Sequence, residues 1–145
     1  MRSMLREGLK RLIPNTPDQA RYARGRRRAT VIAVSSQKGG VGKTTSSVCL
    51  GAALARFHGS HTLILDMDAQ GHVEKSLCQH IVSRRGRTSD VLLSTEGADI
   101  LDTVVDTSYE RLHITGADSA LNEAESLMST RIGKEFILKD ALEFT

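Results

Sequence analysis

Residues 35–45 read SSQKGGVGKTT, and this stretch holds the glycines and side chains with which a protein can bind phosphates. Glycines in a short turn let consecutive backbone N–H groups point inward around an anion. Lys43 supplies an ammonium group that would meet the β- and γ-phosphates, and the Thr44 hydroxyl would bind Mg²⁺. The stretch therefore predicts a site for a nucleoside triphosphate, formed by Lys38, Gly39, Gly40, Val41, Gly42, Lys43, Thr44 and Thr45.

A pair of carboxylates follows a second apolar run. Residues 61–66 read HTLILD, which is the pattern of a buried parallel strand that ends on Asp66, and Asp68 follows two residues later. Ligands of open α/β sheets bind at the carboxyl ends of strands. Both carboxylates are therefore expected in the same crevice as the phosphate-binding loop.

Strands and helices must position these two motifs. The run 30–34 (TVIAV) predicts a strand that leads into the loop, and 43–58 predicts an amphipathic helix that ends at Gly59. A further strand is expected at 111–115 (RLHIT). The other expected helices lie at 74–81, 89–93, 99–105, 118–128 and 131–144. This order predicts an α/β P-loop NTPase fold, doubly wound around a mostly parallel sheet.

The loop departs from the general pattern GxxxxGK[ST] in one informative way. Gln37 stands where the first glycine would be, and Lys38 opens a KGG triplet. This form, KGGxGK[ST]T, resembles the deviant Walker A motif of the ParA/MinD family of ATPases. The resemblance implies that the nucleotide is ATP. It also gives Lys38 a catalytic role, in which the side chain reaches across a nucleotide-sandwich dimer to the partner's phosphates.

The second motif also resembles this family. Residues 66–72 read DMDAQGH, similar to the family signature DxDPQGN, with Ala69 in place of proline and His72 in place of asparagine. By this resemblance Asp68 is the second catalytic residue, which orients or activates the attacking water and approaches Mg²⁺ through a water molecule. Asp66 matches the supporting carboxylate at the strand end.

The resemblance implies a function and partners as well. Gln70-Gly71 favours the partition branch of the family. The implied protein is an ATP-hydrolysing switch that dimerises with ATP, binds DNA nonspecifically and is stimulated by a ParB-like protein. It would act in plasmid or chromosome partition, or in positioning another cargo. A nucleotide-binding module that does not hydrolyse ATP is the alternative from another class.

Composition excludes several other classes. The chain has 145 residues, 39% of them apolar, with no apolar run near the ~20 residues of a membrane span. Three Phe, two Tyr and no Trp disfavour a base-stacking surface for single-stranded nucleic acid. Cys49 and Cys78 have no metal-binding spacing, and we expect both to be reduced core residues of a cytoplasmic protein.

Positive charge is concentrated at the N-terminus. Residues 1–29 form a basic extension with nine Lys/Arg against two acidic residues, a net +7, whereas residues 30–145, the expected ATPase domain, have net −4. Apolar residues recur at helical spacing in 1–13, and an Arg-rich linker follows. Its candidate contacts with DNA or a membrane surface are Arg24, Arg26, Arg27 and Arg28.

The basic extension has three interpretations. It could be a solvated tail, or an electrostatic contact with DNA phosphates or anionic lipid. It could also hold a docking helix, because residues 18–24 (DQARYAR) resemble the DQAxxLR motif of flagellar-number regulators, which are MinD-like ATPases. A second basic segment, 83–88 (SRRGRT), is expected to be a mobile solvated loop, and a DNA contact is the alternative.

The resemblance covers residues 30–145 and stops before a segment that the family has. The Walker B strand and its Asp are absent, so we expect an N-terminal portion of a longer ATPase or a truncated product. In the family the Walker B strand pairs beside the P-loop strand. Without it the run 31–34 would leave backbone groups unpaired, and we expect these 145 residues alone to fold poorly and not to hydrolyse ATP.

Overall fold

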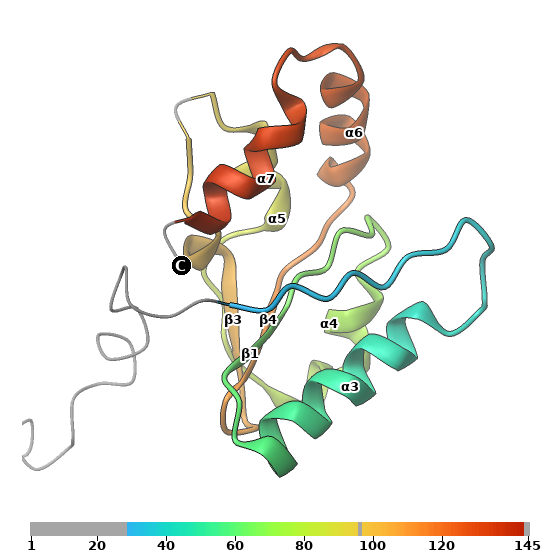
Figure 1. The fold of residues 1–145 in the computed structure, drawn as a ribbon, viewed down its shortest axis with the longest axis vertical. Coiled ribbons are helices and arrows are strands. Elements are labelled where there is room, and N and C mark those ends of the chain that lie inside the picture. The colour runs from blue at the N-terminus through green and yellow to red at the C-terminus, as the bar shows by residue number, and fades with distance from the viewer. Residues whose placement is uncertain (1–28, 96, 144–145) are drawn as a thin grey trace, which may run out of the picture.

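A computed structural model describes residues 29–95 and 97–143. The order of elements alternates helices with short strands (Figure 1). In chain order they are α3 (Lys43–His58), β1 (Thr62–Ile64), α4 (His72–Ser76), the 3₁₀ helix η1 (Cys78–His80), β2 (Ile81–Ser83), α5 (Thr88–Leu93), the 3₁₀ helix η2 (Ile100–Thr103), β3 (Val104–Thr107), β4 (Leu112–Thr115), α6 (Ala120–Thr130) and α7 (Lys134–Glu143). In these described residues no helix is long and apolar enough to span a bilayer.

The sheet is mixed, which corrects the expectation of a mostly parallel one. Its four strands have the order β1-β4-β3-β2. β1 and β4 are parallel, with Leu63 opposite His113, whereas β3 is antiparallel to both β4 and β2. β3 and β4 are joined by only residues 108–111, where Arg111 has a φ of 66°, and so short a connection can join only antiparallel strands.

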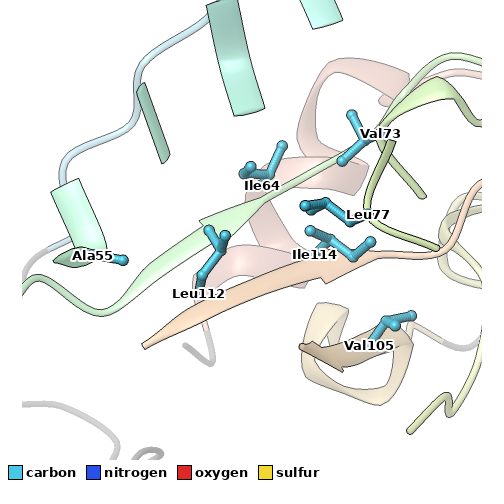
Figure 2. Packing of buried hydrophobic residues seen from close by; sticks show 7 residues of the cluster. All are labelled: Ala55, Ile64, Val73, Leu77, Val105, Leu112 and Ile114. Carbon is cyan, nitrogen blue, oxygen red and sulfur yellow. The ribbon is translucent and has the colours of Figure 1, made fainter. Parts of the chain in front are cut away.

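Helices cover both faces of the sheet. On one face, Ala55 of α3 and Val73 of α4 pack against Ile64, Leu112 and Ile114 (Figure 2). Side chains alternate along a strand, so Leu65, one residue after Ile64, points to the other face. There it joins a cluster that includes Val91 of α5 and Ala141 of α7. The helical layers predicted on both faces are therefore present.

The expected strand 30–34 is not formed. The segment has no regular secondary structure, and Val31 and Ile32 are 77% and 57% exposed. Figure 1 draws it as a blue coil that leads into the turn before α3. A strand forms only where its backbone N–H and C=O groups pair with a neighbour. The described strands pair only among themselves, in the order β1-β4-β3-β2, and residues 30–34 pair with neither outer strand of this sheet.

The remaining elements agree with the sequence in part. The helix 43–58 is confirmed, with Gly59 in the left-handed conformation that ends it, and so are the strands at 61–66 and 111–115 and the two C-terminal helices. The helix expected at 99–105 is wrong: the 3₁₀ turn η2 passes into β3, where Val104 and Val105 are β-branched and buried. Cys49 and Cys78 are exposed, so their assignment to the core is also wrong.

Candidate nucleotide-binding site

The loop 35–42 leads directly into α3. Gly40 and Gly42 have φ angles of 70° and 88°, in the left-handed region that favours glycine. Gly42 precedes the first residue of the helix, and its carbonyl accepts a hydrogen bond from the Ser46 N–H at 2.8 Å. The glycines at 40 and 42 therefore make the sharp turn that the sequence predicted before the helix.

Within this loop, Lys43 is held close to Lys38. The Lys43 Nζ donates a hydrogen bond to the Lys38 carbonyl at 3.3 Å, and the Lys38 N–H donates to the Ser36 Oγ at 3.2 Å. The residues 38–41 are exposed, while Lys43 and Thr44 are half-buried at the helix start. The ammonium group of Lys43 thus lies folded back over the loop, beside the Lys38 carbonyl.

The first turn of α3 is suited to an anion. No side chain caps its N-terminus, and no acidic residue lies in its first turn. The first N–H groups of a helix have no intrahelical partner, and the helix dipole places partial positive charge there. The loop and the helix end together therefore provide backbone donors and positive charge for bound phosphates.

Asp66 lies at the carboxyl end of β1, as the sequence predicted. It is 6% exposed, and its backbone N–H donates to the Thr115 Oγ1 at 3.0 Å. Its two carboxylate oxygens accept from the N–H groups of Asp68 at 3.0 Å and Val73 at 3.3 Å. Burial raises the pKa of Asp66, although the two hydrogen bonds oppose this shift. Asp66 therefore organises the turn that follows it.

Asp68 lies on that turn and is exposed. Its Oδ1 accepts from the Gln70 N–H at 2.9 Å, and its carbonyl accepts from the Gly71 N–H at 2.9 Å. The turn ends at Gly71, after which α4 begins. An exposed carboxylate held in a fixed turn can accept a hydrogen bond from water or bind a hydrated cation.

Two buried threonines support this end of the sheet and were not predicted from the sequence. Thr88 and Thr115 are both 0% exposed, and the Thr88 Oγ1 lies 2.9 Å from the Thr115 Oγ1 and 3.0 Å from the Gly116 carbonyl. Thr115 could have been found as a polar residue at the end of an expected strand. Thr88 carries no local signal, because its partner lies 27 residues away.

The two motifs are each formed, but in the described part of the chain no hydrogen bond or ion pair joins the loop 35–45 to the turn 66–71. No group of three or more His, Cys, Asp or Glu that could hold a metal ion is found among the described residues. A cavity of about 490 Å³ borders the turn at Met67 and Ala69 and extends to α6 and α7. The Arg residues of the basic linker lie outside the described residues.

A glycine-rich turn that opens a helix, beside a sheet covered on both faces, defines the class as an α/β domain of the P-loop nucleoside triphosphatase type. A family model described as an AAA domain matches residues 29–144. Sporulation initiation inhibitor protein Soj of Bacillus subtilis is 39% identical over 113 residues, which cover 78% of this chain and 44% of Soj. The chain therefore belongs to the ParA/Soj family of P-loop ATPases.

Other relatives give the same assignment. The chromosome partitioning protein ParA of Caulobacter vibrioides is 37% identical over 78% of this chain and 41% of its own length, and that of Myxococcus xanthus is 37% identical over 83% and 43%. The chain thus spans less than half the length of these relatives.

Solved structures share the fold. Cobyrinic acid a,c-diamide synthase from Mycobacterium smegmatis, with a bound ATP analogue and magnesium, superposes with a TM-score of 0.63 at 33% identity, over 74% of this chain and 42% of that chain. A plasmid partition protein from Borrelia burgdorferi has a TM-score of 0.56 at 24% identity, over 74% and 46%, and supports the fold alone.

Proposed function

We propose that this chain is the nucleotide-binding part of an ATP-hydrolysing dimerisation switch of the ParA type, acting in plasmid or chromosome partition or in cargo positioning. The observation that carries the proposal is the loop 38–45 at the start of α3, with Lys43 folded over it and the helix N-terminus uncapped. Membership of the ParA/Soj family supports ATP as the nucleotide.

The residues present suit ATP with Mg²⁺. The turn at Gly40 and Gly42 leaves open space where a side chain would stand, so the phosphates can approach the backbone. Lys43 would neutralise the β- and γ-phosphates, and the Thr44 hydroxyl would be the protein ligand of Mg²⁺. Bound Mg²⁺ would supply charge neutralisation at the transferred phosphoryl group.

Asp68 would act on the attacking water. A carboxylate that accepts a hydrogen bond from water holds one of its protons and directs the oxygen lone pair toward the phosphorus atom. The Asp66 carboxylate is occupied by two backbone N–H groups, which fits a supporting role. Lys38 is exposed, so it would be accessible to a second protomer.

Dimerisation distinguishes this function from simple nucleotide binding. Lys38→Ala should leave ATP affinity nearly unchanged and abolish ATP-dependent dimerisation, whereas Lys43→Ala should weaken ATP binding about 10- to 100-fold and the ATP-dependent dimerisation with it. The test measures nucleotide affinity and mass in solution, with and without ATP, on the complete gene product. If Lys38→Ala dimerises normally, the sandwich-dimer assignment is wrong, and a nucleotide-binding module becomes the better description.

The partners follow the same proposal. A ParB-like protein would stimulate hydrolysis, and DNA would be bound nonspecifically by the dimer in the cytoplasm. The basic extension, residues 1–29, would contact DNA phosphates or an anionic membrane surface by charge rather than by base recognition. The flagellar-regulator alternative keeps the same nucleotide site and differs in what this extension docks.

A further inference from the structure

Glu74 is a nearly buried carboxylate fixed between two arginines. It lies on α4, directly after the turn that carries Asp68, and its side chain is 11% exposed. The Glu74 Oε1 lies 2.6 Å from the Arg84 Nη1, and the Oε2 lies 3.0 Å from the Arg87 Nη1. A carboxylate with both oxygens on guanidinium groups has a defined orientation, unlike a solvated surface pair.

This arrangement corrects the sequence-based expectation for residues 83–88. Residues 84–87 form a loop, as expected, but not a free basic patch, because Arg84 and Arg87 both bind Glu74. The first residue of the segment, Ser83, is the last residue of β2, and its last residue, Thr88, is the first residue of α5.

Arg87 is anchored to two other parts of the fold. Its Nη1 also donates to the Ala117 carbonyl at 3.4 Å, in the connection that follows β4. Its backbone N–H donates to the Asp90 Oδ2 at 2.7 Å at the start of α5. A Cβ on Gly116 would come within 3.1 Å of the Arg87 Nη1, so the guanidinium group lies directly over the end of β4.

These contacts complete a frame around the turn 66–71. At its first residue, Asp66 is held by Thr115, which is itself bonded to Thr88. At its far end, α4 is held by the ion pair between Glu74 and Arg87. Since Arg87 and Thr88 are adjacent in the chain, one segment fixes both ends of the turn.

We propose that Arg87 is a positioning residue for Asp68, which acts through Glu74 and α4 to hold the Asp68 carboxylate toward its water. The inference rests on the proposed function, because it assigns Asp68 the water-orienting role. Arg84 is 51% exposed and is the weaker support, whereas Arg87 is 37% exposed and contacts the end of β4 as well as Glu74.

The test compares Arg87→Met with Arg111→Met in the complete gene product. Arg111 is a matched control because it is 40% exposed, and its Nη1 donates to the Gly59 carbonyl at the opposite end of β4. Hydrogen exchange at the amides of Asp68, Gly71 and Val73 is measured without nucleotide. Arg87→Met should accelerate this exchange by about tenfold, and Arg111→Met should leave it unchanged.

Steady-state ATP hydrolysis gives the second measurement. Arg87→Met should lower kcat by about 10- to 100-fold, since small misplacements of a catalytic group have effects of this size. KM should stay within about twofold, because the phosphate contacts of the loop are intact. Arg87→Lys keeps the charge next to Glu74 and should recover part of kcat. Arg111→Met should retain the kcat of the unsubstituted protein.

The two proposals fail in different ways. If the unsubstituted protein does not hydrolyse ATP, the proposed function is wrong, and the exchange measurement alone decides whether Arg87 holds the turn. If Arg87→Met and Arg111→Met give the same exchange at the turn, the positioning role of Arg87 is wrong. Faster exchange without a loss of kcat would show that Arg87 only stabilises the fold.

Discussion

Thr115→Val should destabilise the protein because it leaves one buried hydrogen-bond donor, the Asp66 N–H, without its acceptor. The substitution keeps the shape of a side chain that is 0% exposed and removes a hydroxyl that lies 3.0 Å from the Asp66 N–H. Thr88 keeps a partner, because its Oγ1 also lies 3.0 Å from the Gly116 carbonyl. Among the described residues the Asp66 N–H has no second hydrogen-bond acceptor, so the cost is the burial of one amide without a partner.

The expected loss is about 2 kcal/mol, since an unsatisfied buried donor costs roughly 1–3 kcal/mol. With a urea m-value of roughly 1–3 kcal/mol per molar, the unfolding midpoint should fall by about 1 M. Equilibrium unfolding in urea, followed by circular dichroism, measures this directly. The m-value should not change, because the folded state keeps its buried surface.

Thr103→Val is the matched control. Thr103 is 1% exposed, but its hydroxyl donates at 2.7 Å to the Ile100 carbonyl, so its removal orphans no N–H group. It should cost about 1 kcal/mol or less, the usual net value of one hydrogen bond. If Thr115→Val costs no more than Thr103→Val, the argument that Thr115 anchors the strand end beside the site is refuted.

Four further predictions concern other parts of the molecule. Asp68→Ala should lower ATP turnover by about 10²- to 10⁴-fold and trap the ATP-bound dimer, which turnover and mass measurements check; turnover within about threefold would assign the role elsewhere. Burial raises the pKa of Asp66, so the stability that its titration contributes is fully present at low pH and is lost as pH rises through the raised pKa. Urea unfolding across acidic pH should show this loss in the unsubstituted protein and not in Asp66→Asn. The same dependence of stability on pH in both proteins would contradict it. Gly51→Val should cost about 1–3 kcal/mol in the same assay, since even a Cβ would lie 2.8 Å from the Ile64 Cδ1, whereas Cys49→Val on the exposed side of α3 should cost little. Deleting residues 1–28 removes net charge +7, so binding to random duplex DNA or anionic vesicles should weaken and lose salt dependence; unchanged curves would leave the extension as a solvated tail.

The parts of the fold predicted from the sequence are those whose signal is local. The helix 43–58 has helical periodicity and a terminal glycine, and both appear in the structure at Lys43–His58 and Gly59. The strand before Asp66 and the strand 111–115 are short apolar runs that end in polar residues. Asp66 was expected at the end of a parallel strand with Asp68 two residues later, because ligands bind at the carboxyl ends of such strands, and both residues lie on the turn 66–71.

The parts that were missed depend on partners distant in sequence. β2 and β3 have only three and four residues, too few for apolar periodicity to show. The short connection at 108–111 makes β3 and β4 antiparallel, and β2 pairs with β3 across residues 84–103. The run 30–34 has strand-forming residues but pairs with no strand of the described sheet. Arg84 and Arg87 read as solvated charges until Glu74 is placed next to them.

Binding of Mg·ATP tests the central claim most directly. Isothermal titration calorimetry compares the unsubstituted protein with Lys43→Ala and, as a control, Lys75→Ala, whose Nζ bonds the Gln70 carbonyl outside the loop. A charged hydrogen bond contributes about 1.5–3 kcal/mol, so Lys43→Ala should bind Mg·ATP about 10- to 100-fold more weakly, and Lys75→Ala should bind like the unsubstituted protein. Equal affinity for Lys43→Ala and the unsubstituted protein would contradict a phosphate site in the loop 38–45.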